Sequence, residues 1–103
     1  MMTVYIDGKV ALSTPGTATF YNGIEIGAMD PSGDARWFKG KLDEIRVWRV
    51  ARTQEEILST MRKPLAGNEA NLVAYYNFDE TTGTTLPDVT ENRNDGTLNG
   101  NPV

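Results

Sequence analysis

The sequence WFKGKLDEIRVW, which runs from Trp37 to Trp48, is the longest strand candidate in the chain. Its apolar residues do not keep one phase, because Phe38 and Leu42 share one parity while Ile45 and Val47 share the other. Successive side chains of a strand point to opposite faces of a sheet. Either both faces of this strand are covered, or a β-bulge at the acidic pair between the two stretches resets the register.

Further strands are predicted on both sides of this segment. Val4–Val10 reads as a β-hairpin, because Asp7-Gly8 suits the positive φ angles of a type I′ turn. Leu72–Phe78 is apolar on both faces, which is typical of a central strand. Four further elements are predicted: a strand pair over Thr19–Ala28, a surface loop over Met29–Arg36, a turn over Ser13–Thr17 and a short strand at Gly96–Leu98.

One helix is predicted, over residues 54–63. Thr53 and Glu56 have the spacing of a capping box, in which the hydroxyl and the carboxylate each accept an amide proton from the other residue. Arg62 and Lys63 suit the negative end of the helix, and Pro64 stops it. The chain is therefore expected to be all-β and antiparallel, with one short helix.

Composition excludes several classes of function. The 103 residues contain no Cys and no His, which removes disulfides, thiolate metal sites and the Ser-His-Asp triad. No apolar run approaches the roughly 20 residues of a membrane span, so no membrane span is expected. Nucleic acid is not expected as a partner either, because the net charge is −4 and the central bases alternate with apolar residues. The N-terminus lacks the pattern of a signal peptide, which leaves the localisation unknown.

Three segments together resemble laminin G-like, or concanavalin A-like (pentraxin-like), jelly-roll domains: Tyr5–Lys9, Phe38–Trp48 and Leu72–Glu80. Residues 1–63 are similar to the C-terminal half of such a domain, and residues 68–103 to its N-terminal opening. The resemblance implies a single β-sandwich module over residues 1–103, half-sized or permuted. It also implies a secreted or cell-surface location, since the family is common in bacterial proteins of that kind.

The function expected from this resemblance is a non-catalytic binding or adhesion module that recognises a glycan or a protein. The alternative is a structural half-jelly-roll that self-associates, most simply as a homodimer, to complete its core. A glycan hydrolase is a remote third interpretation. Asp43 and Glu44 are adjacent, so in a strand they point to opposite faces and cannot flank one glycosidic bond. Structural roles are expected instead, with Glu44 paired to Arg46 and Asp43 fixing the bulge.

Two candidate binding sites follow from the residue types. Oxygen ligands for Ca²⁺ are available at Asp79, Asp88, Asn92 and Asp95, with Glu80 and Asn94 in the same stretch. The resemblance favours Ca²⁺ there, although Asn-Asp-Gly is also ordinary turn chemistry. Three aromatic residues are candidates for a sugar-stacking platform, namely Tyr21, Trp37 and Tyr75, and their alternative role is in the core.

Overall fold

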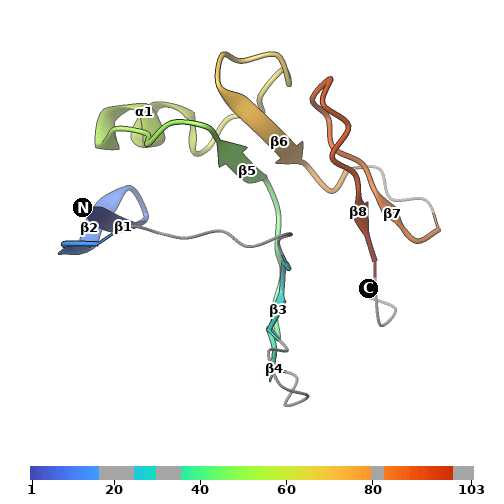
Figure 1. Cartoon of the computed structure of the whole chain (residues 1–103), viewed down its shortest axis with the longest axis horizontal. Helices are drawn as coiled ribbons and strands as arrows, with labels where there is room; N and C mark the ends of the chain where they lie inside the picture. Colours follow the sequence, from blue (N-terminus) through green and yellow to red (C-terminus); the bar gives the residue numbers. More distant parts are fainter. Residues whose placement is uncertain (17–24, 30–35, 80–82, 99–103) are drawn as a thin grey trace. The chain divides into compact units, whose positions relative to one another are not determined.

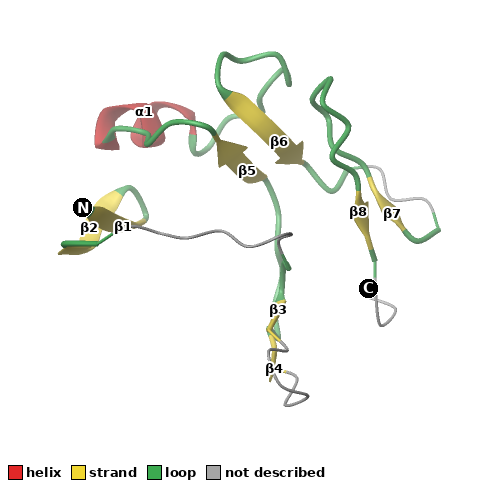
Figure 2. Cartoon of the chain, in the orientation of Figure 1, coloured by secondary structure: helices red, strands yellow, loops and turns green. Residues whose placement is uncertain are grey.

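The computed structural model describes residues 1–16, 25–29, 36–79 and 83–98. The chain divides into two compact units, Met1–Leu42 and Asp43–Val103, and each is considered by itself. In chain order the elements are β1 (Met2–Ile6), β2 (Lys9–Thr14), β3 (Ala28–Met29), β4 (Arg36–Trp37), β5 (Ile45–Trp48), α1 (Gln54–Thr60), β6 (Leu72–Tyr76), β7 (Thr85–Leu86) and β8 (Gly96–Thr97) (Figure 1). Among the described residues, these strands form four antiparallel pairs and α1 is the only helix (Figure 2). The predicted class of antiparallel strands with one short helix is confirmed.

The first unit opens with the predicted hairpin of β1 and β2. Asp7 and Gly8 have φ angles of 54° and 76°, and they join Ile6 directly to Lys9 across the turn. Those positive φ angles are what a type I′ turn requires. β2 is longer than predicted, since it includes Ser13.

The predicted long strand from Trp37 to Trp48 is interrupted. β4 ends at Trp37 and β5 begins at Ile45, so the residues between them are not strand. Glu44 has a φ of 53°, which is left-handed backbone, and its N–H donates to the Asp43 carboxylate at 2.9 Å. The change of apolar phase therefore marks a break in the strand and not a bulge within it.

The ends of the predicted Met29–Arg36 loop pair with each other. Met29 in β3 lies opposite Arg36 in β4, and the Phe38 N–H donates to the Gly27 carbonyl at 2.9 Å just beyond this pair. Glu25–Gly27 was predicted as strand but lies outside β3.

The helix begins where the sequence predicted. The Thr53 hydroxyl accepts from the Glu56 N–H at 3.2 Å, and the Glu56 carboxylate accepts from the Thr53 N–H at 3.0 Å. The capping box is confirmed, but the helix ends at Thr60 and not at residue 63. Ser59 and Thr60 both donate their hydroxyl groups to the Glu56 carbonyl, a local bond that competes with continued helix.

The core of the second unit lies along β6. This strand pairs with β5, and Leu72, Ala74 and Tyr75 are buried on its two faces. Leu86 of β7 is also buried, and β7 pairs with β8. The predicted strand is present but ends at Tyr76, and among the described strands it pairs with β5 alone, so it is not the central strand that its apolar faces indicated. The short strand β7 was not predicted.

Candidate functional site

The carboxylate of Asp88 accepts four hydrogen bonds. Its Oδ1 accepts from the backbone N–H groups of Tyr75 and Thr90, each at 2.9 Å. Its Oδ2 accepts from the Thr90 hydroxyl at 2.9 Å and from the Asn94 N–H at 2.8 Å. The residue is 0% exposed. Four donors therefore take up the acceptor capacity of a carboxylate that has no access to water.

The segment that contains Asp88 closes the edge of β6 away from β5. The Val89 N–H donates to the Tyr75 carbonyl at 2.8 Å. Asn92 donates its amide to the Val73 carbonyl at 2.9 Å, and the side chains of Thr90 and Asn94 donate to the same oxygen at 3.3 Å. Backbone groups of β6 that would face water are thus paired, although no regular strand lies there.

The predicted calcium ligands Asp88, Asn92 and Asp95 are engaged in hydrogen bonds in this structure. Asp88 has no oxygen lone pair left for a metal, and Asp95 accepts the Asp88 N–H at 2.8 Å. Within the described ranges, no three acidic side chains gather closely enough to hold an ion. In this geometry the Asp88 carboxylate binds backbone groups, and its role as a calcium ligand stays a prediction. Calcium binding through Asp79, Asn92 or Asp95 stays a prediction, and Glu80 lies outside the described residues.

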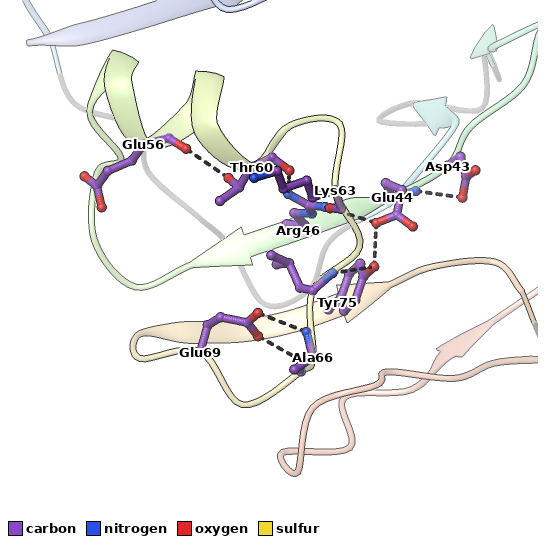
Figure 3. Close-up of polar contacts among 11 residues, drawn as sticks. Asp43, Glu44, Arg46, Glu56, Thr60, Lys63, Ala66, Glu69 and Tyr75 are labelled. Atoms are coloured by element: carbon purple, nitrogen blue, oxygen red, sulfur yellow. Dashed lines mark hydrogen bonds and ion pairs between the residues drawn. The ribbon is translucent and has the colours of Figure 1, made fainter.

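A second polar cluster joins Glu44, Arg46 and Tyr75 (Figure 3). Arg46 forms the predicted ion pair with Glu44 at 3.2 Å, and Tyr75 donates its hydroxyl to the same carboxylate oxygen. The Leu65 N–H donates to the Tyr75 oxygen at 3.2 Å. Burial, together with the hydrogen bond to Glu44, raises the pKa of Tyr75. Tyr75 is only 1% exposed, so the structure corrects its proposed role in sugar stacking and places it in the core.

The same arginine holds the C-terminal end of α1. Its Nη1 donates to the Thr60 carbonyl at 2.8 Å, and its Nη2 donates to the Lys63 carbonyl (Figure 3). Arg46 lies 5.5 Å from the ring centroid of Tyr75 and its side chain is 11% exposed. The sequence predicted that Arg62 and Lys63 would meet the negative end of the helix, but a cation from β5 does so.

The exposed aromatic residues lie in the first unit. Trp37 is 67% exposed and Phe38 is 57% exposed. The Phe38 ring lies against Gly40, where an added Cβ would be 2.8 Å from two ring atoms. Lys39 and Lys41 are also exposed. We call these four exposed side chains, with Gly40, the Trp37–Lys41 surface.

Trp37 is the one sugar-stacking candidate that the structure places at the surface. Tyr21 lies outside the described residues, and Tyr75 is in the core. The other tryptophan, Trp48, is covered on one face by the Arg52 guanidinium, 3.9 Å from the ring centroid. Phe38 was not predicted as a binding residue, because it shares a parity with Leu42 within a stretch that was expected to be one strand.

A family model described as the concanavalin A-like lectin/glucanases superfamily matches residues 1–58. No curated protein and no solved structure matched the chain. A search of the described residues for a helix long and apolar enough to cross a membrane found none.

Proposed function

The chain belongs to the concanavalin A-like lectin/glucanases superfamily, and from this premise we propose that it is a non-catalytic module that binds a glycan. The observation that carries the proposal is the Trp37–Lys41 surface, where two large aromatic side chains lie exposed next to each other in the sequence. Such aromatic residues are typical of the centre of a binding surface. The alternative is that the module binds a protein. A secreted or cell-surface location agrees with a glycan ligand and with a protein ligand.

The state of Glu44 supports a non-catalytic role. Glycoside hydrolysis uses two carboxyl groups about 5–10 Å apart, one of which must give or take a proton. The Glu44 carboxylate instead accepts from Tyr75 and Arg46. Its neighbour Asp43 accepts the Glu44 N–H and so serves the left-handed turn before β5. In this proposal both Asp43 and Glu44 stabilise the fold and neither acts in catalysis.

Replacing Trp37 with alanine should weaken glycan binding about thirtyfold. Truncating an aromatic hot-spot residue costs about 2 kcal/mol of binding free energy, and each change of about 1.4 kcal/mol alters the dissociation constant tenfold. The measurement is a glycan array followed by calorimetric titration of the strongest ligand. Leu58→Ala is the matched control, since Leu58 is 50% exposed on α1. Equal affinity of Trp37→Ala and the unmodified chain would contradict the proposal.

A second candidate function, self-association, is favoured by the β1–β2 hairpin. Met2, Val4 and Ile6 alternate along β1 and share a face, and Leu12 lies opposite Val4. The exposed fractions of these four side chains are 42%, 40%, 63% and 54% in that order. A two-stranded hairpin is at best marginally stable in water, so this apolar face needs a partner. We propose that a second copy of the chain supplies it.

Light scattering should then report twice the mass of one chain at high concentration and a fall towards one mass on dilution. Leu12→Glu should shift the equilibrium to the monomer, because it places a charge in the apolar face. Leu58→Glu introduces the same charge at an exposed position of α1 and should leave the mass unchanged. A monomer at every concentration would refute self-association.

A further inference from the structure

The Trp37–Lys41 surface is positively charged in a chain that is acidic as a whole. Residues 36–42 hold three bases and no acid, whereas the complete chain has a net charge of −4. Two of these bases, Lys39 and Lys41, follow the exposed aromatic pair and are themselves exposed. Exposed aromatic rings and exposed cations therefore occur within five consecutive residues.

Neither lysine is used by the fold in the part of the chain that the structure describes. The ion pairs found there join Arg46 to Glu44 and Arg52 to Glu56. Gly40 separates the two lysines and lies under the Phe38 ring, which leaves no room for a Cβ without displacing that ring. Because Gly40 has no side chain, the Phe38 ring lies against the backbone at the residue between the two lysines.

We propose that this surface selects acidic polysaccharides over neutral ones, an inference that rests on the glycan-binding function proposed above. Trp37 and Phe38 would stack against sugar rings, while Lys39 and Lys41 would pair with carboxylate or sulfate groups of the same polymer. Exposed charge pairs of this kind are screened by salt. Binding should therefore be strong at low ionic strength and weaken steeply as salt is added.

Three polymers with one backbone provide the test: dextran, carboxymethyl-dextran and dextran sulfate. We expect both acidic dextrans to bind at least about tenfold more tightly than dextran at low salt. The double variant Lys39→Gln/Lys41→Gln should reduce that affinity to the level of dextran and flatten its dependence on salt. Lys9→Gln is the matched control, because Lys9 is an exposed lysine in β2 of the same unit. Trp37→Ala should weaken binding to all three polymers.

The outcomes separate this proposal from the function on which it rests. Equal affinity for neutral and acidic dextrans, or equal losses in Lys9→Gln and in the double variant, would overturn selectivity for acidic polymers and leave glycan binding intact. Failure to bind any dextran or any arrayed glycan would overturn the glycan-binding function itself. A difference between the two acidic dextrans would identify carboxylate or sulfate as the preferred group.

Discussion

Replacing Asp88 with alanine should lower the free energy of unfolding by about 3–5 kcal/mol, the range expected when a buried charged partner is removed. The substitution leaves the N–H groups of Tyr75, Thr90 and Asn94 without their acceptor inside the protein. It also frees the Thr90 hydroxyl. Because small domains are stable by only about 5–15 kcal/mol, this change should remove much of the stability of the fold.

Urea unfolding followed by circular dichroism measures this effect. Glu91→Ala is the matched control, because Glu91 is an exposed acid in the same segment and should change stability by less than about 0.5 kcal/mol. Asp88→Asn should lie between the two, since the amide keeps the volume and one acceptor oxygen but turns a donor towards two other donors. If Asp88→Ala unfolds at the same urea concentration as Glu91→Ala, the carboxylate does not hold the edge of β6.

The pH dependence of stability gives a second readout of the same group. Burial acts to raise the pKa of Asp88, but hydrogen bonds from Tyr75, Thr90 and Asn94 outweigh it and leave the pKa below its usual value. A carboxyl with a depressed pKa contributes stability above its unfolded pKa of about 3.9 and loses it as the pH falls towards the folded value. The unmodified chain should thus lose stability below about pH 4, and Asp88→Asn should lack that component.

Local signals in the sequence were sufficient wherever the interacting atoms are close along the chain. The Asp7-Gly8 turn pairs Ile6 with Lys9, three positions apart in the sequence. The capping box likewise joins Thr53 to Glu56 within one helical turn. In both cases the residue type determines the backbone geometry with little help from tertiary contacts. Their positions were therefore predicted correctly.

The sequence did not reveal contacts between distant residues. Asp88 lies 13 positions from Tyr75, whose N–H it accepts. In the sequence it is followed by Asp, Asn and Gly residues, which indicate either a metal site or a turn and give no sign of a contact with β6. An acidic residue that accepts four hydrogen bonds cannot be told from a ligand by composition alone. Glu44 illustrates the same limit. Its left-handed backbone interrupts the Trp37–Trp48 stretch, which strand propensity predicted to be one continuous strand. Exposure of Trp37 and Phe38 likewise became evident only with the structure.

Arg46 is a further case in which a tertiary contact takes the place of an expected local contact, here between Arg62 or Lys63 and the end of α1. Its substitution should have the second largest effect on stability. Arg46→Met should lower the free energy of unfolding by about 2–3 kcal/mol. The apolar stem is kept, whereas the bonds to the Thr60 and Lys63 carbonyls and the ion pair to Glu44 are lost. The expected loss is below that of a fully buried pair because Glu44 remains 33% exposed.

Arg62→Met is the matched control for Arg46→Met. Arg62 is an exposed arginine just after α1, at a position where a positive charge is expected to interact with the helix dipole. Urea unfolding should show a large loss for Arg46→Met and a change below about 0.5 kcal/mol for Arg62→Met. The opposite order would mean that the helix end depends on its own flanking charges. The expected order would mean that α1 is held at its first turn by local capping and at its last turn by a side chain from β5.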